Sequence, residues 1–132
     1  DAKEFTWTGS NLASALISST WYREDLSQYL INKSALTFDV RVESPPEKAL
    51  YVQMGCGKSV CGKFDIAPIL NKFKPNTWNN LSIDLLCFAN KGVEFERSSA
   101  PFALTSEGAT KVRIANVQFE PNTSHKATIK CD

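Results

Sequence analysis

Four cysteines are the residues of this chain whose type and spacing could do chemistry. Cys56 and Cys61 have four residues between them and lie among glycines, whose backbone freedom allows a sharply folded loop. We favour a local disulfide between these two, which leaves Cys87 and Cys131 as the second pair among three possible pairings. Zinc bound by all four cysteines is the alternative, disfavoured because no second short-spaced pair exists. Disulfides would in turn predict an oxidising compartment.

Catalytic groups are scarce in the sequence. The glycine-rich letters GCGKS resemble a phosphate-binding loop only superficially, because the flanking cysteines would hold the loop in another shape. The single histidine, His125, is in a polar C-terminal segment that gives no support for a Ser–His–Asp triad. Paired carboxylates for glycoside hydrolysis would have to come from ordinary surface or turn residues, namely Glu24, Asp25, Asp39 and Asp84. The sequence therefore predicts a protein that is not an enzyme.

Sugar recognition needs simpler residues, because aromatic rings stack on pyranose rings while polar side chains hydrogen-bond the hydroxyls. Such residues alternate with the apolar positions of the predicted strands and so point away from the core. If their strands are neighbours in one sheet, we expect one polar, aromatic surface, and the alternative is an ordinary solvated sheet face. The residues are Asp39, Arg41, Tyr51, Gln53, Arg113 and Gln118.

A second candidate sugar site is the loop segment that contains Trp21, Tyr22 and Arg23. A tryptophan exposed in a loop is a common platform for stacking on a sugar ring. In the alternative interpretation, Trp21 covers the edge of the core and Arg23 pairs with one of the two acidic residues that follow it.

Alternating apolar and polar residues predict the strands that must position these side chains. We expect Trp7 and Trp78, which begin or lie in such strands, to be core residues. A helical turn is predicted near Leu26–Leu30, and one short helix at Ile66–Phe73 with Asp65 as its N-cap. The strands are predicted around Phe5–Trp7 and at Leu12–Ser19, Ala35–Glu43, Leu50–Met54, Trp78–Leu85, Pro101–Thr105 and Lys111–Glu120, the last with a bulge near Ala115–Asn116. Short strands with frequent turns indicate an all-β fold, an antiparallel β-sandwich with one short helix.

Composition limits the classes of protein that remain. The 132 residues are 42% hydrophobic and 22% charged, which suits one globular domain. We assign residues 1–120 to this domain and residues 121–132 to a polar C-terminal tail. A net charge of +1 argues against nucleic-acid binding, and no apolar run predicts a membrane span or a signal peptide. Because the chain does not begin with Met, we expect a mature product or an excised domain.

Two sequence motifs resemble the C-terminal domain of bacterial family 3 glycoside hydrolases of the exo-β-glucanase type, a galactose-binding-like jelly roll. They are MGCGKSVCGKFDIAPILNKF at residues 54–73 and NTWNNLSIDLLCFANKG at residues 76–92. The resemblance extends roughly from Trp7 to Phe119. Cys131 lies beyond that pattern, and the catalytic domains that precede such a module are absent from this chain. Shorter matches are WYREDLS at residues 21–27, FDVRV at residues 38–42 and APF at residues 100–102.

This resemblance implies a non-catalytic, secreted or periplasmic carbohydrate-binding module that recognises a β-glucan or related polysaccharide and targets an attached glycoside hydrolase. The alternative is a structural accessory domain that docks on the catalytic domains and stabilises them without binding sugar. Expected partners are a polysaccharide or oligosaccharide and a hydrolase catalytic domain, with no nucleic acid and no membrane. No cofactor is predicted, although a structural calcium ion is left open, with Glu4 and Glu120 as its candidate ligands.

Overall fold

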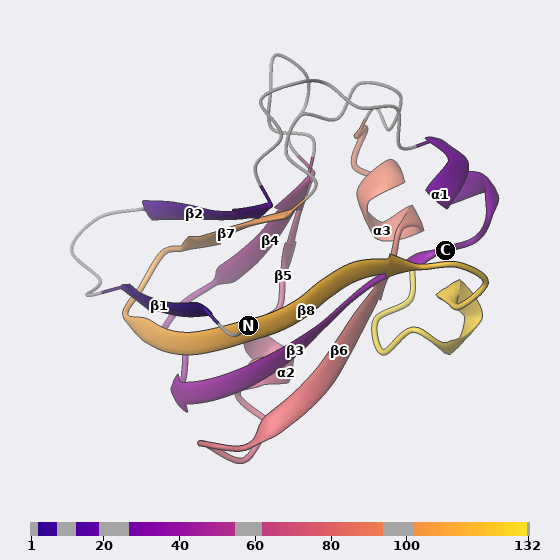
Figure 1. Ribbon diagram of the computed structural model, residues 1–132. Helices are drawn as coiled ribbons and strands as arrows, with labels where there is room; N and C mark the ends of the chain where they lie inside the picture. Colours follow the sequence, from indigo (N-terminus) through magenta and orange to yellow (C-terminus); the bar gives the residue numbers. More distant parts are fainter. Residues whose placement is uncertain (1–2, 8–12, 19–26, 55–61, 94–101, 132) are drawn as a thin grey trace.

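The structure, a computed structural model, describes residues 3–7, 13–18, 27–54, 62–93 and 102–131. Their eight strands form two four-stranded sheets in which every pairing is antiparallel (Figure 1). The apolar faces of the two sheets meet in one core. The predicted all-β antiparallel sandwich is therefore confirmed.

Sheet A has the strand order β1–β8–β3–β6, with β3 in a central position between β8 and β6. The bulge predicted near Ala115–Asn116 is confirmed. Thr37 of β3 is opposite Gln118 of β8, but Asp39, two residues later in β3, is opposite Ala115, three residues earlier in β8. Asn116 adopts a left-handed φ of 55°, a conformation that asparagine tolerates better than most residues. The strands of sheet A are β1 (Lys3–Trp7), β3 (Ala35–Ser44), β6 (Trp78–Asp84) and β8 (Thr110–Glu120).

Sheet B has the strand order β2–β7–β4–β5. Its strands β4 and β5 are consecutive and antiparallel, so the segment predicted as a strand, a cysteine-bracketed loop and then a short helix contains a further strand, β5, before the helix. Four residues are too few to show an alternation, and strand β5 was missed for that reason. The strands of sheet B are β2 (Ala13–Ser18), β4 (Leu50–Met54), β5 (Gly62–Asp65) and β7 (Phe102–Ser106).

The core lies between the sheets and is built from alternate residues of the strands. In β3 the odd-numbered residues Asp39 and Arg41 point outward while Phe38 and Val40 are fully buried. In β4 the phase is the same, with Tyr51 and Gln53 only partly buried between buried neighbours. Since the inner faces of the sheets share one core, the outer faces lie on opposite sides of the sandwich. The largest fully buried side chains include Phe38, Leu50, Met54, Leu70, Leu81, Phe88 and Leu104.

Short helices connect the strands, and there are more of them than the one predicted. The turn expected near Leu26–Leu30 is confirmed as α1 (Ser27–Ile31), and the helix expected at Ile66–Phe73 is reduced to α2 (Ala67–Leu70). Asp65 accepts a 2.9 Å hydrogen bond from the backbone N–H of Ala67, although Ile66 is the N-cap residue. The helix α3 (Leu86–Ala89) and the 3₁₀ turn η2 (Ser124–Lys126) were not predicted. No helix among the described residues is long and apolar enough to cross a membrane.

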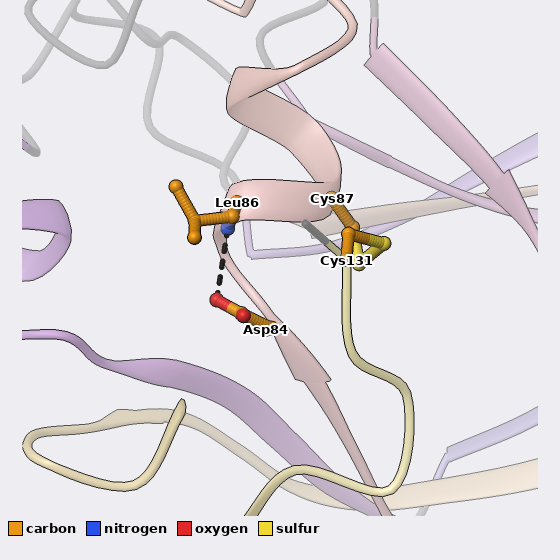
Figure 2. The surroundings of a disulfide bond; sticks show 4 residues. All are labelled: Asp84, Leu86, Cys87 and Cys131. Carbon is orange, nitrogen blue, oxygen red and sulfur yellow. Dashed lines mark hydrogen bonds between the residues drawn. A yellow bond between two sulfur atoms is a disulfide. The ribbon is translucent and has the colours of Figure 1, made fainter. Parts of the chain in front are cut away.

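The C-terminal segment packs along β6. The backbone N–H of Ile129 donates to Ser82 at 2.9 Å, and the N–H of Asp84 donates to Ile129 at 2.9 Å. A disulfide between Cys87 and Cys131 then joins the end of this segment to α3, as Figure 2 shows. The predicted pairing of these two cysteines is confirmed, while the domain boundary at residue 120 stays a prediction.

Candidate functional site

The outer face of sheet A carries a row of four side chains, one from each strand. Glu4 of β1 is opposite Arg113 of β8. Arg41 of β3 lies between Arg113 on one side and Trp78 of β6 on the other. Residues directly opposite each other in a sheet project from the same face, with Cβ atoms about 5 Å apart. We call Glu4, Arg113, Arg41 and Trp78 the cross-strand row.

Trp78 is the aromatic member of the cross-strand row, and its placement in the core was a wrong prediction. Its side chain is 45% exposed. The strand phase explains the exposure, because Leu81 and Ile83 are buried and Trp78 is an odd number of residues from both. The period-2 pattern of β6 could therefore have identified Trp78 as an outward residue, but its size and hydrophobicity were given more weight.

Ion pairs hold the charged members of the row in place. Glu43 lies 2.7 Å from Arg113 Nε and 3.4 Å from Lys111 Nζ. Glu4 lies 2.9 Å from Lys111 Nζ and 3.4 Å from Arg113 Nη2. Arg41 Nε is 3.9 Å from Glu43, at the limit of the network. Three cations share two carboxylates, so this part of the surface keeps one positive charge.

The pKa values on this face agree with a charged, paired network. A hydrogen bond from Lys111 lowers the pKa of Glu4, and the nearby positive charges lower it further. The same hydrogen bond to Glu4, together with the charge of Glu4, raises the pKa of Lys111. Both groups are therefore charged at neutral pH.

A second polar row adjoins the first on the same face. Asp39 of β3 is opposite Asn80 of β6, which donates a 3.0 Å hydrogen bond to the carboxylate. Asn116, at the bulge of β8, donates to the other carboxylate oxygen at 2.7 Å. The bond from Asn116 and then that from Asn80 lower the pKa of Asp39, because both stabilise its ionised form. Arg41 of the cross-strand row lies two residues after Asp39 on the same face of β3, so it connects the two rows.

This face suits binding rather than hydrolysis. A glycosidase needs one carboxyl group that stays protonated and donates its proton to the leaving group. On sheet A, Glu4 and Asp39 have lowered pKa values, and Glu43 is ion-paired to Arg113. What the face does offer is an exposed indole beside guanidinium, carboxylate and amide groups, which can stack on a sugar ring and bond its hydroxyls.

Tyr51, the aromatic residue predicted for the sugar-binding sheet face, lies on the opposite side of the sandwich. Tyr51 and Gln53 belong to β4 of sheet B, so their strand is not a neighbour of β3 and β8, and the condition for one continuous surface is not met for these two residues. Gln53 accepts a hydrogen bond from Thr105, and the ammonium group of Lys63 lies 4.4 Å from the centre of the Tyr51 ring. Partial burial, followed by the nearby Glu107 and Asp65 carboxylates, raises the pKa of Tyr51.

The structure thus divides the predicted sugar-binding residues into two groups. It brings together Asp39, Arg41 and Arg113, with Gln118 further along β8, and separates Tyr51 and Gln53 from them. Trp21 and Tyr22, the loop candidates, lie outside the described residues, as do Cys56 and Cys61.

The candidate calcium ligands do not converge. Glu4 is opposite Arg113 and paired with cations, whereas Glu120 is opposite Ala35, seven residues further along β8. Within the described part of the chain, no three His, Cys, Asp or Glu residues are grouped as a metal site would require.

Two antiparallel sheets packed around one core define a β-sandwich domain. The family model Exop_C, whose description is "Galactose-binding domain-like", matches residues 1–119 of this chain. The chain belongs to this family, and its resemblance to the C-terminal domain of exo-β-glucanases is thereby confirmed. No curated protein matches the chain.

Solved structures share the fold at low sequence identity. One is the extra C-terminal domain of the exo-1,3/1,4-beta-glucanase ExoP from a Pseudoalteromonas species, with TM-score 0.74, 19% identity and coverage of 100% of this chain and 70% of that one. In the structure of ExoP itself the match has TM-score 0.73 and 19% identity, and covers 98% of this chain but 15% of that one. A family 30 carbohydrate-binding module of a cellulosomal cellulase of Clostridium thermocellum matches with TM-score 0.71, 15% identity and coverage of 90% and 73%.

Proposed function

We propose that this chain is a non-catalytic carbohydrate-binding module that recognises a β-glucan or related polysaccharide through the outer face of sheet A. The observation that carries the proposal is the exposed Trp78, aligned across the strands with Arg41, Arg113 and Glu4. An exposed indole that heads a row of hydrogen-bonding groups matches what a polysaccharide needs, which is one stacking platform and several donors and acceptors.

The dimensions of the row favour an extended ligand. Four strands at about 4.8 Å spacing place Trp78 and Glu4 roughly 14 Å apart, which exceeds the width of one sugar ring. Glu43 forms ion pairs with Lys111 and Arg113 and so fixes these two side chains before the ligand arrives. Less side-chain conformational entropy is then lost on binding. A polysaccharide lying across the strands would contact Trp78 at one end and the charged side chains at the other.

The structural matches support this class of ligand. One matched domain is named a carbohydrate-binding module and another belongs to an exo-1,3/1,4-beta-glucanase, so we infer a β-glucan for this chain and an attached glycoside hydrolase as its partner. Binding would raise the local concentration of that enzyme at its substrate. We also infer a secreted or periplasmic location, for which the Cys87–Cys131 disulfide is suited.

Calorimetry of the wild-type chain and of Trp78→Ala against laminarin, mixed-linkage glucan, cellulose and agar-type polysaccharides tests the proposal. Loss of an aromatic anchor costs about 2 kcal/mol, so we expect roughly a 30-fold weaker affinity in Trp78→Ala. The matched control is Tyr51→Ala, which removes the aromatic residue of the opposite face and should bind like the wild type. Absence of binding to every polysaccharide, or loss of binding only in Tyr51→Ala, would contradict the proposal.

A second candidate function is docking on catalytic domains without sugar affinity. It is favoured by the match inside ExoP, where a domain of this fold is part of an exo-glucanase chain. In that case a full-length protein with a catalytic region would lose several degrees of Tm when this domain is deleted, and Trp78→Ala would have no effect on polysaccharide retention.

A further inference from the structure

One positive charge in the ion-pair network of sheet A has no close carboxylate. Glu43 lies 2.7 Å from Arg113 Nε. Glu4 lies 2.9 Å from Lys111 Nζ. Each of the two carboxylates is therefore engaged by its own cation. Arg41 has only the 3.9 Å contact of its Nε with Glu43, so the remaining charge of the network is carried by Arg41.

The guanidinium group of Arg41 is also unused as a hydrogen-bond donor. Its Nε is buried and makes no hydrogen bond within the described part of the chain. The side chain as a whole is 34% exposed, so a ligand on the outer face can reach it. A guanidinium carries five N–H donors in a fixed plane, and those on the terminal amino groups are the ones that a ligand would use.

The other carboxylate on this face of β3 is held by amides. Asp39 lies two residues before Arg41, and its oxygens accept hydrogen bonds from Asn80 at 3.0 Å and from Asn116 at 2.7 Å. The ion pairs among the described residues do not include one between Asp39 and Arg41. Asp39 therefore leaves the guanidinium group of Arg41 to a ligand.

Trp78 lies directly opposite Arg41, on the adjacent strands β6 and β3 (Figure 1). Residues paired in this way have Cβ atoms about 5 Å apart. The indole is 45% exposed, and within the described residues it takes part in no ring contact or cation–π contact. An open aromatic ring and an open guanidinium group are thus neighbours on one face of the sandwich.

We propose that the polysaccharide bound at sheet A carries carboxylate groups, that is, sugar rings of the uronic acid type, and that Arg41 recognises them. This rests on the proposed carbohydrate-binding function and names the substrate class of the same site. A pyranose ring stacked on Trp78 can extend its C6 substituent over the neighbouring strand β3, where Arg41 lies. A planar guanidinium matches a planar carboxylate through two parallel hydrogen bonds, and this pairing is stronger than a bond to a neutral hydroxyl. A neutral glucan would leave the charge of Arg41 without a close partner.

The experiment is calorimetry of the 132-residue chain with matched pairs of ligands. One pair is laminarin and laminarin oxidised to the carboxylate at C6, and the other is cello-oligosaccharides and their C6-oxidised counterparts. We expect the oxidised member of at least one pair to bind about tenfold more tightly or better, and Trp78→Ala to weaken that binding. Equal or weaker binding of the oxidised member in both pairs, or a preference that Trp78→Ala does not affect, would overturn the proposal.

Failure of this proposal differs from failure of the proposed function. If the neutral ligands bind through Trp78 as tightly as the oxidised ones, the carbohydrate-binding function stands and the preference for carboxylates is wrong. If no member of either pair binds, both are contradicted.

Two variants test the role of Arg41. Arg41→Gln removes the charge and keeps a polar side chain, and we expect the preference for the oxidised ligand to fall below about threefold. Lys63→Gln is the matched control, because it removes one positive charge from the opposite face, beside Tyr51, and should keep the preference. An unchanged preference in Arg41→Gln, or an equal loss in Lys63→Gln, would overturn the proposal. The comparison of ligands on the wild-type chain remains decisive even if Arg41→Gln folds poorly.

Discussion

Removal of the Cys87–Cys131 disulfide should destabilise the domain by an amount that its position in the chain determines. The two cysteines are 44 residues apart, and closing a loop of that length removes about 13 cal/mol/K of entropy from the unfolded chain. At 25 °C this corresponds to about 4 kcal/mol, a large fraction of the roughly 5–15 kcal/mol that stabilises a typical domain. We expect Cys87→Ala/Cys131→Ala to lose about 4 kcal/mol of unfolding free energy and roughly 15 °C of Tm.

Guanidinium denaturation followed by tryptophan fluorescence measures this loss. Alanine is preferred to serine because Cys87 is 1% exposed and a serine hydroxyl there would be buried without an assured partner. Substitution is preferred to a reducing agent, which would act on every disulfide in the chain. Cys131→Ala alone breaks the same bond and should agree with the double variant within about 0.5 kcal/mol. A loss below about 1 kcal/mol in both variants would refute the loop-closure argument.

Two further variants test the bulge in β8 and the close packing at β5. Asp39→Asn should lower stability at pH 7 by about 1 kcal/mol, because the hydrogen bonds from Asn116 and Asn80 favour the ionised carboxylate. Because the folded state lowers the pKa of Asp39, its carboxylate adds to the free energy of unfolding above the unfolded pKa of ~3.9, and this contribution is lost as the pH falls through the folded pKa. The stabilities of wild type and variant should therefore converge in acid unfolding curves below about pH 4. A constant difference at all pH values would contradict this. Gly62→Ala should cost about 1–3 kcal/mol, because its Cβ would lie 2.2 Å from Val93 Cγ2. Adding Val93→Ala should recover part of that loss in thermal denaturation, and strictly additive effects would show that the contact is not the cause.

The sequence predicted the elements that carry a local pattern. Residues 36–43 alternate over eight positions, and residues 111–120 alternate on both sides of one phase change; β3 and β8 form there with the expected inward residues. The bulge was also predictable, because the apolar phase changes between Ile114 and Val117. Segments of four residues, such as β5 and α3, carry too little periodicity to be recognised.

Which strands are neighbours could not be predicted in the same way. The alternation of β3 and of β4 shows that Arg41 and Tyr51 leave the core, but it contains no information on which sheet each strand joins. Pairing is a non-local property that the whole set of strands decides together. For that reason the predicted surface divides between two faces, while Trp78, whose own strand pattern pointed outward, was assigned to the core.

The two faces proposed as sugar sites differ in whether a charged group covers their aromatic ring. On sheet B, the Lys63 ammonium lies 4.4 Å from the Tyr51 ring centre and so occupies the ring face on which a sugar would stack. Displacing it would forfeit a cation–π contact of about 0.5–1 kcal/mol before any sugar contact is gained. On sheet A, no ring contact or cation–π contact involves Trp78 among the described residues, although Arg41 is directly opposite it in β3. The indole of Trp78 is therefore available for stacking on a sugar without the displacement of a described cation.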